Sequence, residues 1–350
     1  MSGDRLRVVV ATPLSDADAA WIVELEPRID LVREPDLLPP MRHPADFSGD
    51  PAFRRTPEQQ QRFDDLVDGA DALYGIPDVD PAALARTVRA NPNLRWVQTM
   101  AAGGGAQVRA AGLSTDELER VAFTTSAGVH GGPLAEFAVF GVFAGAKDLP
   151  RLRRQQDRHE WSGRWAMRQV ADLRILVLGL GGIGTETVRQ FVSAGADVVG
   201  FNRTGEGTVD GARVAALSEI GTHLPEADAV VVTLPGTAST EGFLDDAFFA
   251  QLNPGTIVVN VGRGTVIDEA ALLRALDAGQ VGFAALDVFA AEPLDAASPL
   301  WTHPNVLVSP HTAALDPREE RRIAELFAVN AGRLLDGTPL RNVVDTIEFY

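Results

Sequence analysis

The feature that most constrains this chain is a run of large apolar residues that leads directly into a glycine-rich loop. Residues 175–184 read ILVLGLGGIG, and a helix-compatible stretch over 185–193 follows. A buried strand, a G-x-G-x-x-G loop and a helix in this order are typical of a dinucleotide site. The glycines let the backbone approach the pyrophosphate, and the first N–H groups of the helix bind it. The residues expected at the pyrophosphate are Gly179, Gly181, Gly182, Ile183 and Gly184.

The end of the second strand indicates which dinucleotide binds. Residues 197–201 read DVVGF and run into Asn202, where an enzyme that uses NAD usually has an acidic residue for the ribose 2′-hydroxyl. Asn202 does not repel a 2′-phosphate, and Arg203 with Thr204 offers charge-assisted hydrogen bonds to it. We therefore expect NADP in preference to NAD. The alternative is that Arg203 is an ordinary solvated arginine.

Length and composition indicate a large globular protein. With 350 residues, of which 45% are hydrophobic, the chain suits two domains with separate cores. The absence of cysteine excludes disulfides, thiolate nucleophiles and thiolate metal ligands. A net charge of -17 argues against nucleic-acid binding, which needs basic surface. Because no apolar run is long enough for a signal peptide or a membrane span, we expect a cytoplasmic protein without a membrane partner.

Strands and helices alternate along most of the chain. The strands are continuous apolar runs, as expected for a parallel sheet with both faces covered. In the later part, strands are expected near 174–179, 197–201, 229–234, 256–261, 283–287 and 306–309, with helices near 185–193 and 268–278. The first third repeats this pattern more weakly, with strands near 7–11, 72–76 and 94–100 and helices near 17–25 and 81–90.

This alternation predicts an α/β fold of two doubly wound parallel-sheet domains. We expect a Rossmann-type nucleotide domain over 126–315 and a flavodoxin-like substrate-binding domain formed by 1–125 and 316–350. Residues 34–60 are rich in proline and charge, which indicates a surface loop or lid; a functional loop and an inert insertion both remain open.

Two further segments are predicted to be helical. Residues 133–147 are apolar nearly all round, so we expect a helix buried on several sides, with the second subunit of a homodimer as one cover. Residues 317–335 are expected to form an amphipathic helix that returns to the first domain.

Arginine, glutamate and histidine follow three strands of the nucleotide domain in turn. Arg263 lies in NVGRGT, Glu292 in LDVFAAEP and His311 in VSPHTA. Because the carboxyl ends of parallel strands meet at one edge of the sheet, these side chains can converge on one bound nicotinamide. A guanidinium can bind and polarise a 2-oxo acid, an imidazole can supply a proton, and a carboxylate can hold the imidazolium. Taken singly, each residue also has an ordinary structural explanation.

Together, after the glycine loop and in this order, the three residues resemble those of the D-2-hydroxyacid dehydrogenase family, which includes glyoxylate and hydroxypyruvate reductases. The resemblance extends over about residues 70–310 and includes the stretch WVQTMAAGG at 96–104. It implies that Asp287 lies beside the nicotinamide carboxamide. The further cofactor contacts that it implies are Leu234, Pro235, Thr240, Val261 and Gly262. It implies substrate contacts at Arg263 and His311 and, through backbone N–H groups that face the substrate carboxylate, at Ala102, Gly103 and Gly104.

These features predict an oxidoreductase that transfers a hydride between NADP(H), or NAD(H), and a small 2-oxo or D-2-hydroxy acid, with His311 as general acid/base. Glyoxylate and hydroxypyruvate are examples of such substrates. Two alternatives stay open. Formate dehydrogenase shares the fold, but Glu292 argues against it, because formate dehydrogenases of this family resemble one another in having a glutamine at this position. A nucleotide-sensing, co-repressor-like interaction protein is the alternative from another class, and the retained catalytic residues weigh against it.

Overall fold

The computed structural model describes residues 5–43, 45–347 and 349. The chain forms two compact units: one runs up to His130 and resumes at Leu315, and the other comprises Gly131–Ala314. The crossings thus lie near the expected boundaries at 125/126 and 315/316. Within the described residues, no helix combines the length and the apolar character that crossing a bilayer requires.

The second unit is built on a seven-stranded sheet in which every strand pairing is parallel. The order β12-β11-β10-β9-β6-β7-β8 runs outward in both directions from β6, which is the Rossmann arrangement. This confirms the predicted fold class and adds β8, which the sequence pattern did not indicate. The strands are β6 (Arg174–Leu178), β7 (Asp197–Asn202), β8 (Arg213–Ala216), β9 (Ala229–Val232), β10 (Thr256–Asn260), β11 (Val281–Leu286) and β12 (Val306–Val308).

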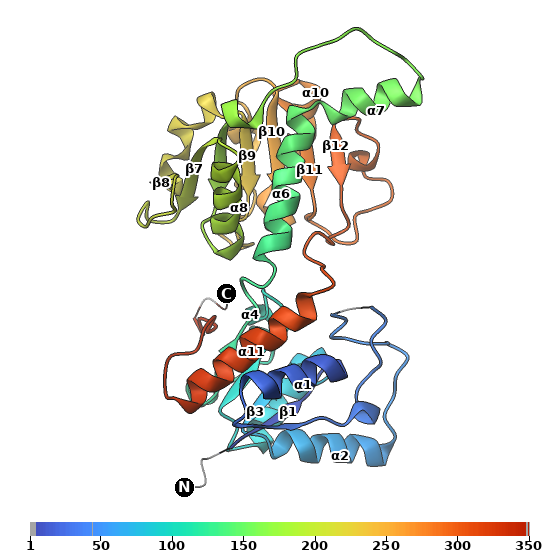
Figure 1. Cartoon of the computed structure of the whole chain (residues 1–350), viewed down its shortest axis with the longest axis vertical. Helices are drawn as coiled ribbons and strands as arrows, with labels where there is room; N and C mark the ends of the chain where they lie inside the picture. Colours follow the sequence, from blue (N-terminus) through green and yellow to red (C-terminus); the bar gives the residue numbers. More distant parts are fainter. Residues whose placement is uncertain (1–4, 44, 348, 350) are drawn as a thin grey trace. The chain divides into compact units, whose positions relative to one another are not determined.

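Helices cover both faces of this sheet (Figure 1). Successive residues of β6 belong to different cores: Ile175 and Val177 pack with α6 and α8, whereas Leu176 and Leu178 pack with α9 and α10. Because neither face meets water, the strands are apolar throughout. The helices are α6 (Gly131–Ala146), α7 (Leu149–Asp157), α8 (Gly182–Ser193), α9 (Asp246–Phe249) and α10 (Glu269–Asp277).

The first unit contains a five-stranded parallel sheet in the order β2-β1-β3-β4-β5, which is the flavodoxin-like arrangement. Its strands are β1 (Leu6–Val10), β2 (Ile29–Val32), β3 (Ala72–Tyr74), β4 (Trp96–Gln98) and β5 (Ala122–Thr124). Its helices are α1 (Asp16–Leu25), α2 (Pro57–Asp68), α3 (Pro81–Ala90), α4 (Gly105–Ala110), α5 (Thr115–Arg120) and α11 (Glu319–Leu335). The helix α11 returns to this unit as expected, because Phe327 stacks on Trp96 with ring centroids 4.5 Å apart.

The segment 34–60 lies mostly at the surface, as expected, but it is partly helical and is anchored by a few buried residues. Its last residues belong to α2, which begins at Pro57 because the Thr56 side chain caps the helix. The part before Thr56 packs against its own unit: Leu37 is buried in the core, and its carbonyl accepts a 2.7 Å hydrogen bond from the Arg55 guanidinium. The segment is therefore an irregular but packed loop.

Candidate active site

The glycine loop after β6 has the backbone that a dinucleotide site requires. Gly179 has a φ of +103°, and a Cβ at Gly184 would collide with the Gly179 carbonyl oxygen, so both positions need glycine. A Cβ at Gly181 would meet nothing within 4 Å, which leaves the loop open on that side. The N–H groups of Gly182 and Ile183 at the start of α8 meet no acceptor among the described residues. This cradle fits a pyrophosphate.

In the turn after β7, the three residues of the predicted 2′-phosphate site differ in exposure and in their hydrogen bonds. The Asn202 side chain is occupied within the turn, since its oxygen accepts from the Gly205 N–H at 2.7 Å and its NH₂ donates to the Glu206 carbonyl at 2.6 Å. Arg203 and Thr204 are exposed. In the part of the chain that the structure describes, the Arg203 guanidinium has no hydrogen-bond or ion-pair partner. Asn202 thus shapes the turn, and Arg203 is the group left free to bind an anion.

Asp287, directly after β11, is a fully buried carboxylate with one free oxygen. Its Oδ1 accepts from the Ser309 hydroxyl at 2.5 Å and from the N–H groups of Thr312 and Ala313 at 3.0 and 3.1 Å. Its Oδ2 has no hydrogen-bond partner among the described residues. A buried, unpaired acceptor is costly unless a ligand supplies a donor. An amide such as the nicotinamide carboxamide has the matching chemistry.

The remaining predicted cofactor residues lie in the loops that follow β9 and β10. The Thr240 hydroxyl donates to the Pro235 carbonyl at 2.6 Å, and this hydrogen bond stabilises the turn that begins at Leu234. Gly262 packs against this turn, because a Cβ there would lie 2.6 Å from the Leu234 carbonyl oxygen. Val261 is buried and continues the β10 pairing. These residues hold the segments after β9 and β10 against each other. None of them has a free polar side chain.

Glu292 and His311 form a close pair at the same edge of the sheet. His311 Nδ1 lies 2.6 Å from Glu292 Oε2, and the other carboxylate oxygen accepts from the Phe289 N–H at 2.9 Å. The two side chains are 34% and 49% exposed, so solvent and ligands can reach the pair. The His311 N–H donates to the Asp287 carbonyl at 2.9 Å, which fixes the backbone of the histidine. His311 Nε2 has no partner among residues 5–43, 45–347 and 349.

The charges around Glu292 keep it ionised. Burial raises the pKa of the Glu292 carboxyl, but the hydrogen bonds from His311 and from the Phe289 N–H outweigh burial and leave the pKa below its ordinary value. The charge of Arg263 acts in the same direction. Arg263 itself follows β10, and its guanidinium donates to the Gly262 carbonyl at 2.7 Å. Of the three predicted catalytic residues, Glu292 and His311 are thus in direct contact, and the charge of Arg263 acts on Glu292.

The glycines after β4 lie in the first unit. A Cβ at Gly104 would collide with the Thr99 hydroxyl, so the tight turn needs glycine there. The Gly104 N–H already donates to the Ala101 carbonyl at 3.2 Å and is not free for a substrate, contrary to the expectation for this residue. The N–H groups of Ala102 and Gly103 have no acceptor within the described residues.

Two residues that hold this site were not predicted from the sequence. Asn260, the last residue of β10, accepts from the Gly262 N–H and donates to the Arg263 carbonyl, both at 3.0 Å, which fixes the arginine loop. Ser309 holds the buried Asp287 carboxylate. A polar residue at the end of an apolar strand is the sequence signal that both share.

Comparisons with known proteins identify the family of this chain. The model of the D-isomer specific 2-hydroxyacid dehydrogenase family, NAD binding domain, matches residues 139–313, which is half of the chain. D-3-phosphoglycerate dehydrogenase of Archaeoglobus fulgidus is 30% identical over 216 residues, 60% of this chain and 40% of that protein. Glyoxylate/hydroxypyruvate reductase A of Yersinia enterocolitica is 31% identical over 204 residues, 57% of this chain and 64% of that protein. The matched region thus spans less than two thirds of either relative.

A solved structure extends the similarity to both units. The D-isomer specific 2-hydroxyacid dehydrogenase from Xanthobacter autotrophicus Py2, crystallised with NADPH and MES, is 30% identical with a TM-score of 0.76, covering 99% of this chain and 100% of that one. The resemblance expected from the sequence is therefore confirmed. The chain belongs to the D-isomer specific 2-hydroxyacid dehydrogenase family.

Proposed function

We propose that this protein reduces small 2-oxo acids to D-2-hydroxy acids with NADPH. The observation that carries the proposal is the pair of His311 and Glu292, 2.6 Å apart, at the sheet edge that also holds Arg263 and the glycine loop. When bound, the dinucleotide supplies the hydride to the carbonyl carbon. His311 gives its proton to the carbonyl oxygen, Arg263 binds the substrate carboxylate and polarises the carbonyl, and Glu292 stabilises the imidazolium.

The cofactor is held by residues of the second unit, which is the nucleotide-binding domain. The free N–H groups of Gly182 and Ile183 bind the pyrophosphate, and the unpaired oxygen of Asp287 accepts from the carboxamide. Arg203, unpaired among the described residues, and Thr204 bind the 2′-phosphate, which makes NADPH the preferred cofactor. The NADPH in the Xanthobacter autotrophicus structure supports this preference.

The substrate of this proposal is a small 2-oxo acid. Within the first unit, the free N–H groups of Ala102 and Gly103 are the proposed contacts of its carboxylate. Glyoxylate and hydroxypyruvate are the first substrates to test, because a glyoxylate/hydroxypyruvate reductase is among the relatives. The test is a panel of 2-oxo acids assayed with NADPH and with NADH. The readout is the loss of the reduced cofactor's absorbance. Reduction of none of them with either cofactor overturns the proposal.

The protein acts as a homodimer through the nucleotide-binding domain. The helix α6 packs closely on the sheet, since Cβ atoms at Gly141 and Gly145 would crowd strand residues. The same helix leaves Phe140 and Phe143 48% and 38% exposed, and Trp161, which follows α7, is fully exposed. A second copy covers these aromatic side chains. Light scattering should give twice the 37.3 kDa of one chain, and Phe140→Asp with Phe143→Asp should give single chains. A single-chain mass for the unaltered protein contradicts the dimer.

A further inference from the structure

The proton donor of the proposed mechanism has an unusual backbone conformation. His311 has a φ of +52°, in the left-handed region, and follows shortly after the end of β12. A left-handed backbone costs free energy in any residue that has a Cβ, so the surrounding contacts must hold it there. Pro310, which precedes the histidine, has no N–H to contribute. The N–H groups of His311 and of the residues after it must therefore hold the segment.

These N–H groups all donate to one residue, Asp287, which follows β11. The His311 N–H donates to the Asp287 carbonyl at 2.9 Å. The N–H groups of Thr312 and Ala313 donate to Oδ1 of the same aspartate at 3.0 and 3.1 Å. Successive N–H groups beside a left-handed residue form a concave site for an anion. The Asp287 carboxylate is the anion in this site, so it stabilises the backbone conformation of His311.

The Ser309 hydroxyl holds this carboxylate in its orientation. The hydroxyl donates to the same oxygen, Asp287 Oδ1, at 2.5 Å, a length typical of a hydrogen bond to a charged oxygen. Among the described residues, Ser309 is the one side chain that donates to the carboxylate, and both residues are buried. A carboxylate can rotate about its last side-chain bond. Three donors on one oxygen oppose this rotation, so that Oδ1 faces the histidine segment and Oδ2 stays available.

The position of the His311 ring depends on this arrangement. The ring contacts Glu292 through Nδ1 at 2.6 Å, but its side chain is 49% exposed, so few neighbours confine it. If the Asp287 carboxylate rotates, the two N–H groups after the histidine lose their acceptor. The histidine can then relax toward an ordinary backbone conformation, which takes its ring away from Glu292.

We propose that Ser309 is a positioning residue for both the proton donor and the nicotinamide. Its hydroxyl fixes the Asp287 carboxylate, whose Oδ1 holds the segment of His311 and whose Oδ2 receives the carboxamide. The inference rests on the proposed function, because it takes His311 as the proton donor and Asp287 as a cofactor contact. It adds a buried hydroxyl group that acts on both through the carboxylate.

The first test measures cofactor binding without turnover. In Ser309→Ala, the carboxylate of Asp287 is free to rotate and should present Oδ2 less often to the carboxamide. The Kd for NADPH, measured by titration calorimetry, should rise about five- to tenfold. The Kd for 2′-phospho-ADP-ribose, which lacks the nicotinamide, should change by less than about twofold. An unchanged Kd for NADPH, or an equal increase for both ligands, overturns the inference.

The second test measures the reduction of 2-oxo acids at saturating NADPH. In Ser309→Ala the proton donor is in place for only part of the time, so kcat should fall about ten- to thirtyfold. The KM for the 2-oxo acid should change by less than about twofold, because Asn260 still holds the loop of Arg263. A near-normal kcat in the folded variant overturns the inference. If the unaltered protein reduces no 2-oxo acid, the proposed function fails, and the binding test still decides whether Ser309 orients Asp287.

The matched control is Thr256→Val, which removes another buried hydroxyl group from the same sheet. Thr256 begins β10, at the amino edge of the sheet, and is 1% exposed. Its hydroxyl lies 2.7 Å from the Asn253 carbonyl oxygen and 3.0 Å from that of Ala227, to which it donates. The control should lower the melting temperature about as much as Ser309→Ala does and leave kcat and both Kd values unchanged. Equal kinetic losses in the two variants show a purely structural role and overturn the inference.

A second substitution at the same position covers the case in which Ser309→Ala does not fold. Ser309→Cys keeps nearly the same side-chain volume but replaces the hydroxyl with a weak donor. It should show the same selective increase in the Kd for NADPH and the same fall in kcat. Normal values of both in the folded cysteine variant contradict the inference.

Discussion

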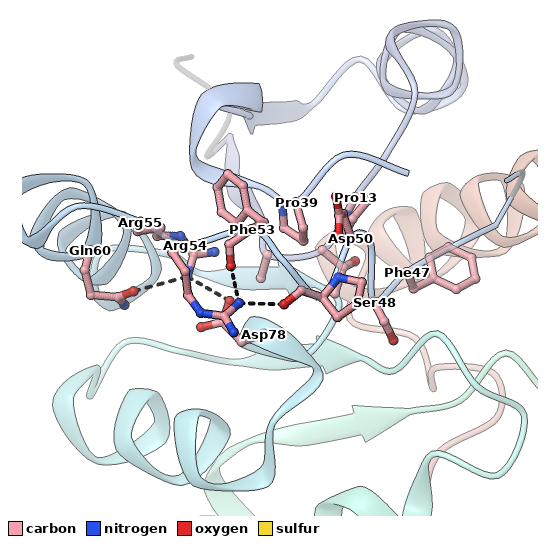
Figure 2. Close-up of a pocket in the computed structure, with 13 residues that line it drawn as sticks. Pro13, Pro39, Phe47, Ser48, Asp50, Phe53, Arg54, Arg55, Gln60 and Asp78 are labelled. Carbon is pink, nitrogen blue, oxygen red and sulfur yellow. Dashed lines mark hydrogen bonds and ion pairs between the residues drawn. The ribbon is translucent and has the colours of Figure 1, made fainter. Parts of the chain in front are cut away.

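The carboxyl edges of the two sheets hold their polar side chains in different ways. In the second unit, Asp287 and Glu292 accept hydrogen bonds from backbone N–H groups, and the His311 ring pairs with Glu292, all within a few residues of a strand end. In the first unit, the packed loop before α2 is fixed by one buried arginine, Arg55, whose partners Leu37 and Asp78 lie before and after it in the chain. Figure 2 shows the ion pair with Asp78.

This difference predicts that substitutions in the two regions have different consequences. The strand ends of the second unit are held by the β-ladder of a buried sheet, which suits groups that must keep a fixed geometry during proton transfer. The loop of the first unit is held by side chains, so substitutions can change its shape without disturbing the sheet. We expect substitutions at the strand ends of the second unit to change turnover, and substitutions in the packed loop of the first unit to change stability.

The largest effect is expected for His311→Ala. Removal of the proton donor should lower kcat for 2-oxo acid reduction by about 10²- to 10⁴-fold, the usual range for a general acid. KM should change much less. Steady-state kinetics with NADPH and hydroxypyruvate measure both constants, and a near-normal kcat would show that another group supplies the proton.

Arg55→Met should destabilise the loop of the first unit. The substitution keeps the apolar stem but leaves Asp78 unpaired and the Leu37 carbonyl without its donor, which should lower the free energy of unfolding by about 2–3 kcal/mol. The matched control is Arg62→Met, whose exposed pair with Glu34 should contribute less than about 1 kcal/mol. Urea unfolding compares the two; equal effects would mean that Arg55 does not fix the loop.

Glu292→Gln should change the pH dependence of reduction. The pKa of Glu292 in the folded protein lies below its ordinary value of 4.5. Above pH 4.5 the carboxylate is therefore charged and contributes its full stabilisation. This stabilisation is lost as the pH falls through the lowered pKa. The unaltered protein should therefore keep the charge of Glu292 beside His311 throughout the range from about pH 5 to 8.

A neutral glutamine side chain at this position cannot stabilise the imidazolium by charge, so the variant should lose reductive activity at a lower pH than the unaltered protein does. The loss at about pH 7.5 should be roughly tenfold or more and should be smaller at about pH 5.5. Profiles of kcat against pH test this. Parallel profiles for the two proteins would contradict a role for the Glu292 charge.

The smallest effect is expected for cofactor choice. Arg203→Ala should raise the KM for NADPH by about tenfold, because one exposed charge-assisted contact is lost, and leave the KM for NADH nearly unchanged. Asn202→Asp should shift preference toward NADH through repulsion of the 2′-phosphate. A preference for NADH in the unaltered protein would contradict the assignment.

The sequence predicted much of the edge in the second unit because its signals are local. An apolar run marks each strand, and a polar residue shortly after it marks the sheet edge, which is how Arg263 and His311 were found. The strand β2 and the loop before Thr56 were harder to predict. The strand is short, and the loop depends on contacts such as that between Arg55 and Asp78, which are distant in the sequence and leave no periodic pattern.

The Gly104 assignment shows a second limit of sequence reasoning. The glycine was correctly predicted to follow β4, but whether its N–H is free depends on the turn geometry. In the structure this N–H donates to the Ala101 carbonyl, so Ala102 and Gly103 are the candidates that remain. The hydrogen-bond partners of a turn follow from backbone angles, which the residue types alone do not determine.

In the proposed mechanism, Arg263 polarises one carbonyl group, which receives a hydride from NADPH and a proton from His311. The most direct test incubates the purified protein with NADPH and hydroxypyruvate and determines both the NADPH consumed and the chirality of the product. This mechanism predicts one D-2-hydroxy acid formed for each NADPH oxidised, and almost none with His311→Ala. An L-product, or NADPH oxidation without a 2-hydroxy acid, would contradict it.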